Sequence, residues 1–281
     1  MERKNVKIRL KDGNLDVKTF SFLDRISIMR DKDLFLDQIC EDIETLKEKD
    51  HFGGCMDKED FRHNLTDSLF KDEQVELFSG KINLSEMTNV IEGIFEKIKD
   101  LLGRREILIY IFPTKSRFVV ESLGGVWGLL AWDDILHIFI NPVQNWELNL
   151  KSTILHELAH CLQDYYSYDM TLFEHLVADG LAEHFQKGFL DDNRNSFTKV
   201  VSRNEAKKIL KELKSFLDKT MNDNPGIHSD LFFGGGKYVS GTGYTIGYYL
   251  IEDYLEKNKN ISWKQLLKKK SEEFRQSPFF I

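Results

Sequence analysis

The feature that most restricts the fold of this chain is the segment Ser152–Leu162, which combines an apolar helix with closely spaced ionisable groups. His156 and His160 are four residues apart, so an α-helix places their imidazoles on one face, with Glu157 beside the first. The remaining positions are mostly apolar or small, namely Ile154, Leu155, Leu158, Ala159 and Leu162. A carboxylate and two imidazoles are costly to bury on such a helix unless a cation compensates them. The segment therefore predicts a buried helix that holds a metal ion.

The same residues form the H-E-x-x-H pattern of zinc hydrolases. Histidine nitrogens bind zinc at about 2.0–2.1 Å, and catalytic sites usually have three protein ligands and one position open to water. Glu157 is rotated by about 100° from His156 on the helix, so it falls beside the metal. We expect it to act as the base on zinc-bound water.

The third ligand is expected from residues 172–185, which have the spacing of a second helix. Asp179 and Glu183 are four residues apart and share a face, so one can bind the metal while the other supports a ligand histidine. His175 is a weaker third choice, because a buried histidine with a satisfied ring is its simpler interpretation.

Two longer motifs give the chain a family resemblance. Eighteen residues separate His160 from Asp179, which begins an Asp-Gly-Leu-Ala segment. Gluzincin peptidases of the aminopeptidase-N type carry their third ligand, a Glu, in a similar segment at that spacing. The chain resembles more closely the YjaZ-like family of predicted zinc-dependent proteases, whose H-E-x-x-H, E-G-L-A-x-x-F and Y-x-I-G-Y motifs correspond to residues 156–160, 179–185 and 244–248.

The resemblance implies a zincin-like fold, a Zn²⁺ cofactor and a peptide or protein substrate, with one departure in the ligands. The family's Glu is Asp179 here, one methylene shorter, so the two helices must approach more closely or Glu183 must bind instead. We favour Asp179. A hydrogen-bond donor for the oxyanion is also needed, and Tyr244 is the first choice, Tyr248 the second and His228 a reserve.

Composition limits the classes of binding partner and the cellular compartment that we expect for this chain. The 281 residues carry a net charge of −7, which argues against a nucleic-acid partner. Cys40, Cys55 and Cys161 are irregularly spaced and indicate neither a disulfide framework nor a cysteine zinc cluster. The first residues lack the apolar part of a secretory signal, and no apolar run is long enough to span a membrane. We therefore expect a cytoplasmic protein, with its oligomeric state left open.

The pattern of the whole chain predicts an α+β fold that is predominantly helical, with a small mixed sheet before the H-E-x-x-H helix. We expect residues 1–104 to form a mostly helical region of unknown role and residues 105–281 to form the zincin-like domain. Expected strands are 6–10, 15–20, 107–112, 118–121, 126–132 and 135–140, the first two joined by a turn at 11–14. Expected helices are 33–49, 85–102, 203–220 and one from residue 244, with a glycine-rich connection at 221–243.

The sequence thus predicts a gluzincin-like zinc metallopeptidase in which Glu157 activates the water that attacks a peptide bond. The alternative is a metal-stabilised binding or regulatory protein with the same fold and no turnover, which the aspartate at position 179 keeps open. Cleavage specificity, and the choice between exopeptidase and endopeptidase action, do not follow from these patterns.

Overall fold

The computed structural model describes residues 6–9, 15–46, 58–70, 76, 84–132, 134–143, 145–167, 169–190 and 198–280. They form two compact units, Met1–Ile154 and Leu155–Ile281. The helix that carries the H-E-x-x-H residues, α5 (Trp146–Cys161), runs across the boundary, so both histidines belong to the second unit. The turn expected at 11–14 lies outside the described residues.

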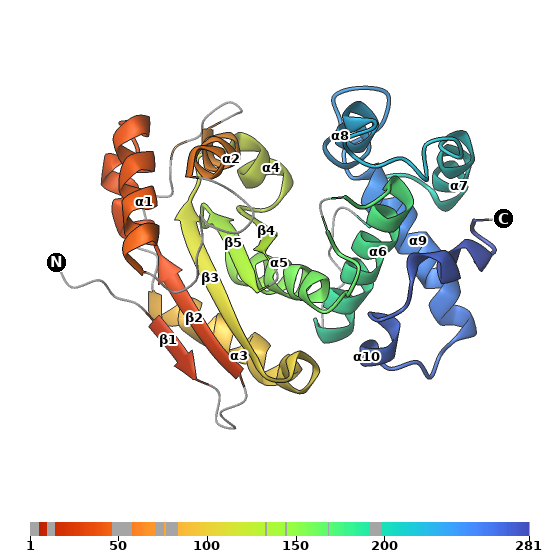
Figure 1. Ribbon diagram of the computed structural model, residues 1–281, viewed down its shortest axis with the longest axis horizontal. Helices are drawn as coiled ribbons and strands as arrows, with labels where there is room; N and C mark the ends of the chain where they lie inside the picture. Colours follow the sequence, from red (N-terminus) through yellow and green to blue (C-terminus); the bar gives the residue numbers. More distant parts are fainter. Residues whose placement is uncertain are drawn as a thin grey trace. The chain divides into compact units, whose positions relative to one another are not determined.

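The first unit is built on a mixed five-stranded sheet with the order β1-β2-β3-β5-β4 (Figure 1). Its strands are β1 (Val6–Arg9), β2 (Leu15–Ser21), β3 (Arg105–Pro113), β4 (Val126–Trp132) and β5 (Ile135–Ile140). The outer pairs β1–β2 and β4–β5 are antiparallel, whereas β3 pairs in parallel with both β2 and β5. The central strand β3 is buried from Ile107 onward, as expected for a strand covered on both faces.

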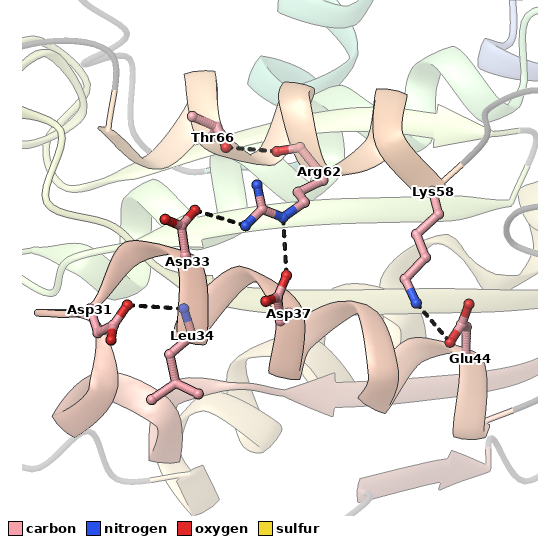
Figure 2. Close-up of polar contacts among 8 residues, drawn as sticks. All are labelled: Asp31, Asp33, Leu34, Asp37, Glu44, Lys58, Arg62 and Thr66. Carbon is pink, nitrogen blue, oxygen red and sulfur yellow. Dashed lines mark hydrogen bonds and ion pairs between the residues drawn. The ribbon is translucent and has the colours of Figure 1, made fainter.

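One face of the sheet packs against α1 (Lys32–Leu46) and α2 (Lys58–Phe70). The shared core contains Tyr110 and Phe112 of β3 together with side chains from both helices, including Phe35, Ile39, Phe61 and Leu65. At the surface, the Arg62 guanidinium donates to Asp33 at 2.8 Å and to Asp37 at 3.2 Å, while Lys58 pairs with Glu44 (Figure 2). These ion pairs join α2 to α1 at three positions along α1.

A further helix, α3 (Leu84–Leu102), carries a buried stripe of Met87, Ile91, Ile94, Phe95, Ile98 and Leu102. A short helix, α4 (Arg117–Ser122), links β3 to β4. We expected a strand at 118–121, and this was wrong. Ser116 accepts a hydrogen bond from the Val119 amide, and this helix cap outweighs the strand preference of the valines.

The second unit is helical, and its centre is the crossing of α6 (Leu172–Phe189) with α9 (Thr242–Lys257) (Figure 1). Around this pair lie α7 (Arg203–Glu212), α8 (Pro225–Phe233), α10 (Trp263–Leu266) and a 3₁₀ turn, η2 (Ser271–Gln276). Thr171 caps α6 through its hydroxyl, and Glu174 completes the capping box. The start of α6 is therefore well defined by local sequence.

Two expectations for this unit need correction. The helix expected at 203–220 ends at Glu212, because the chain turns so that the carbonyls of Leu217 and Lys219 accept from the amides of Phe173 and Leu172. The connection expected at 221–243 contains α8, which begins with Pro225 in its first turn, a favourable position for proline. The helix expected from residue 244 is α9.

At the level of fold class, the α+β prediction with a small mixed sheet before the H-E-x-x-H helix is confirmed. The functional division at residue 104 stays a prediction, and β2 and β3 from either side of it share the sheet. Cys40 and Cys161 are free thiols, and Cys55 lies outside the described residues. Within the described part of the chain, no helix is long and apolar enough to cross a membrane.

Candidate metal centre

The H-E-x-x-H residues lie in the last turns of α5 and face α6. The rings of His156 and His160 are 4.8 Å apart between centroids and nearly perpendicular, at 81°. The Nε2 atom of His156 lies 3.3 Å from Asp179 Oδ1, and the Nε2 atom of His160 lies 3.5 Å from the same oxygen. The ligand atoms of these three residues all lie within 4.8 Å of one another. The structure therefore brings both histidines and Asp179 together.

Each histidine is held by its other ring nitrogen. His156 Nδ1 lies 3.1 Å from Glu183 Oε1, a carboxylate oxygen that can only accept a hydrogen bond. His160 Nδ1 lies 3.3 Å from Gln163 Oε1, and the Gln163 amide nitrogen donates to the Ala178 carbonyl at 3.0 Å. Since that carbonyl only accepts, the amide oxygen must face His160. Both Nδ1 atoms therefore carry the hydrogen.

In neutral imidazoles this tautomer would leave both Nε2 lone pairs pointing at an oxygen of Asp179. Lone pairs repel one another unless a proton or cation lies between them. Burial lowers the pKa of His156, but Asp179 and Glu183 raise it well above its ordinary value. Burial raises the pKa of Asp179, but hydrogen bonds from His156 and His160 lower it below its ordinary value. The cluster is thus organised around a positive charge.

The donor set fits a zinc ion. Atoms bound to one tetrahedral zinc at about 2.0–2.1 Å lie about 3.3–3.4 Å from one another. The two Nε2–Oδ1 separations, 3.3 Å and 3.5 Å, are close to that value. Two imidazole nitrogens and one carboxylate oxygen are also ligands that zinc accepts. Glu183 faces the opposite nitrogen of His156, which is the position of a supporting residue.

Glu157 and Tyr244 lie beside this cluster. Glu157 is 6 % exposed, and its charge raises the pKa of His156. The Tyr244 ring lies 6.1 Å from that of His156. Burial, followed by the charges of Asp179, Glu157 and Glu183, raises the pKa of Tyr244 well above its ordinary value, so its hydroxyl stays protonated and can donate.

The second tyrosine of the motif has different neighbours. The ring of Tyr248 stacks on His184 with centroids 4.2 Å apart, and its hydroxyl accepts from Lys187 at 2.6 Å. The Tyr248 carbonyl lies 2.9 Å from His184 Nε2. These contacts link α9 to α6 one turn beyond Asp179 and Tyr244. They are the contacts of a packing residue.

Two glycines explain why the Asp-Gly-Leu-Ala and Tyr-x-Ile-Gly-Tyr motifs occur together. A Cβ on Gly180 would lie 2.2 Å from the Gly247 carbonyl oxygen, and a Cβ on Gly247 would lie 2.0 Å from that of Leu176. Only glycine at both positions lets the backbones of α6 and α9 approach this closely. Gly180 follows Asp179 and Gly247 is one turn beyond Tyr244, so this crossing brings Tyr244 to the cluster.

The reserve residues pair with each other. His175 Nδ1 lies 3.3 Å from His228 Nδ1, and the rings of both lie against Phe232. Phe232 in turn lies against Tyr244, with centroids 5.1 Å apart. Burial lowers the pKa of His175, and burial lowers that of His228 to about 4. Neither residue joins the group of metal-ligand atoms found among the described residues.

Sequence reasoning missed two residues of the centre. Gln163 orients His160, and the ring of Tyr166 stacks on His160 with centroids 4.1 Å apart. Gln163 follows His160 by three residues, a spacing that allows contact at a helix end, but no pattern distinguishes it from a surface glutamine. Tyr166 lies beyond the end of α5, where helical spacing no longer applies.

The chain matches a known protein family over most of its length. Residues 87–276 match a protein family described as "Predicted Zn-dependent protease (DUF2268)". No curated protein and no solved structure matches the chain. The matched region contains the whole candidate centre, from α5 to α9, and the family description names zinc as the metal.

Proposed function

Because the chain belongs to this family of predicted zinc-dependent proteases, we propose that it is a gluzincin-like metallopeptidase with a zincin-like fold that hydrolyses peptide bonds. The observation that carries the proposal is the convergence of His156 Nε2, His160 Nε2 and Asp179 Oδ1 on one point, with both Nδ1 atoms held from behind. This is how catalytic zinc ligands are arranged in proteins.

In this proposal, His156, His160 and Asp179 are the metal ligands and Glu183 is a positioning residue. The shorter side chain of Asp179 suits the approach of α6 to α5, where its Oδ1 atom lies 3.3–3.5 Å from the Nε2 atoms of both histidines. Glu183 is already engaged, since its other carboxylate oxygen accepts from Gln186 at 2.7 Å. Binding of metal by Glu183 would require giving up its contact with His156 Nδ1.

Zinc held by these residues would supply Lewis-acid chemistry, polarising a water molecule and the scissile carbonyl. Glu157 would take the proton from the attacking water and deliver it to the leaving amine. Its burial beside His156 keeps it close to the reacting atoms and away from bulk solvent. Glu157, the residue that would transfer protons, therefore lies next to the proposed ligand His156 in the sequence and in the structure.

Tyr244 would donate its hydroxyl hydrogen to the oxyanion that forms at the attacked carbonyl. A protonated hydroxyl is required for this role, and the surrounding carboxylates keep the pKa of Tyr244 high, after burial as the first cause. Tyr248, the second choice for this donor, accepts from Lys187 instead and is better suited to holding α9 in place.

The direct test compares Glu157→Gln with the wild-type protein, using metal analysis and the cleavage of casein followed by mass spectrometry. We expect about one zinc per chain in both proteins, because Glu157 is not a ligand. Cleavage should fall about 10²- to 10⁴-fold, the usual contribution of a general base. Glu147→Gln, an exposed substitution in the first turn of α5, is the matched control and should leave activity unchanged.

Two results would contradict the proposal. Absence of stoichiometric zinc from the wild-type protein would contradict the proposed zinc site. Full activity in Glu157→Gln would contradict the proposed role of Glu157 as the general base. If the wild-type protein contains stoichiometric zinc but does not cleave casein at any peptide bond, the result would instead favour a metal-stabilised binding protein.

A further inference from the structure

The turn that follows α5 contacts His160, one of the proposed zinc ligands, at both of its ends. Gln163 bonds to His160 through its amide, and Tyr166 stacks on the same imidazole. The turn is closed by the Tyr166 amide, which donates to the Gln163 carbonyl at 3.4 Å. Tyr165 lies inside this turn, so its backbone is fixed by two neighbours that touch a proposed zinc ligand.

The hydroxyl oxygen of Tyr165 is buried and has no hydrogen-bond partner among the residues that the structure describes. Burial raises the pKa of Tyr165, and the charges of Glu174 and Asp179 raise it further. The hydroxyl is therefore a protonated donor. Glu174 is occupied by its capping box with Thr171, and Asp179 faces the two histidines.

A buried donor without an acceptor costs free energy, so native proteins rarely keep one without a reason. At a binding site the reason is that the missing acceptor arrives with the ligand. The negative charges of Glu174 and Asp179 act on Tyr165 and favour a neutral acceptor over an anion, because a further carboxylate would be repelled. A peptide carbonyl is the neutral acceptor that a peptidase substrate carries in every residue.

We propose that Tyr165 is a substrate-binding residue whose hydroxyl donates a hydrogen bond to a backbone carbonyl of the peptide bound beside His156, His160 and Asp179. This proposal rests on the proposed peptidase function and adds a contact outside its reacting atoms. The hydrogen bond would be made to a carbonyl other than the one that is attacked. It would therefore determine which peptide bond of the substrate lies at the proposed zinc site.

The test uses Tyr165→Phe, which removes the hydroxyl and keeps the ring. Binding to the zinc-loaded protein is measured by calorimetry with two probes, acetohydroxamate and N-acetylleucylglycine hydroxamate. Both carry the same metal-binding group, but only the second has additional peptide carbonyls. We expect the variant to bind the dipeptide probe about 2- to 13-fold more weakly, as for one lost hydrogen bond, and to bind acetohydroxamate as the wild type does.

A stability measurement separates a binding role from a structural one. If the hydroxyl has no hydrogen-bond partner until the substrate binds, ligand-free Tyr165→Phe should have the same melting temperature as the ligand-free wild type, or a higher one. Tyr249→Phe is the matched control, a buried tyrosine of the same unit whose ring lies against Arg203 and Phe279, and it should bind both probes normally.

A lower melting temperature with unchanged probe binding would overturn the proposal, because it would show a hydroxyl satisfied by an internal water. Equal weakening of both probes would also overturn it, because Tyr165 would then act through the metal ligands. Failure of acetohydroxamate to bind wild-type protein would instead contradict the proposed zinc site, so the two failures are distinguishable.

Discussion

Both units of the protein bury histidines, but in opposite surroundings. In the first unit, His137 on β5 is 5 % exposed and its ring edges meet Phe61, Tyr110, Phe112 and Phe139 at interplanar angles of 78–90°. In the second unit, His160 is 3 % exposed, and its nitrogens face an amide oxygen and a carboxylate oxygen. Burial of a histidine therefore does not make a site. The proposed site is distinguished by the hydrogen-bond acceptors that face the nitrogens of the histidine.

The largest expected effect comes from replacing each of these two histidines in turn. His160→Ala should remove stoichiometric zinc and lower peptide cleavage by at least about 1000-fold, because a zinc ligand is lost. His137→Leu, an apolar replacement within the aromatic core, should keep full zinc content. Metal analysis of both purified variants measures the difference. Zinc loss in His137→Leu with the fold intact would break the comparison.

A second pair of variants compares glycines in the two units. Gly247→Ala would place a Cβ 2.0 Å from the Leu176 carbonyl oxygen and should destabilise the protein by about 3 kcal/mol, with loss of activity as Tyr244 moves. Gly93→Ala in α3 meets no atom within 4 Å and should stabilise by about 0.5–1 kcal/mol. Urea unfolding measures both. Equal stability of the two variants would contradict the tight crossing of α6 and α9.

The supporting residues of the cluster should have intermediate effects. Gln163→Leu leaves all three proposed ligands in place but removes the acceptor for His160 Nδ1. We expect zinc affinity to fall about 10- to 100-fold, the usual cost of losing a partner of a ligand histidine. Competition with a chelator measures this affinity. An unchanged affinity would show that His160 is oriented by its stack on Tyr166 alone.

The smallest effect is expected at the surface of the first unit, where Arg62 joins Asp33 and Asp37 (Figure 2). These acids are largely exposed, so Arg62→Ala should destabilise the protein by less than about 1 kcal/mol, and added salt should reduce the difference further. Urea unfolding at low and high salt tests this. A loss of several kcal/mol would show that charges matter more to the first unit than its aromatic core does.

Local sequence predicted the elements whose signals are short-range. The periodicity of α1, α3 and α9 and the apolar runs of β3 and β5 are complete within single segments, and each of these elements is observed. The predictions that were wrong depended on distant contacts or caps. The helix expected at 203–220 stops at Glu212 because its following residues bond to the start of α6, and no pattern within the segment contains that partner.

The proposed ligands divide in the same way. The spacing of His156 and His160 follows from the helical period, so sequence alone placed both imidazoles and Glu157 on one buried helix. The choice between Asp179 and Glu183 depends on how α5 packs against α6, because that packing brings Asp179 Oδ1 to both Nε2 atoms and Glu183 Oε1 to His156 Nδ1. Gln163, Tyr165 and Tyr166 acquire their neighbours only when the chain turns after α5. Periodicity encodes a face of one helix, whereas distances between helices exist only once the packed backbones are in place.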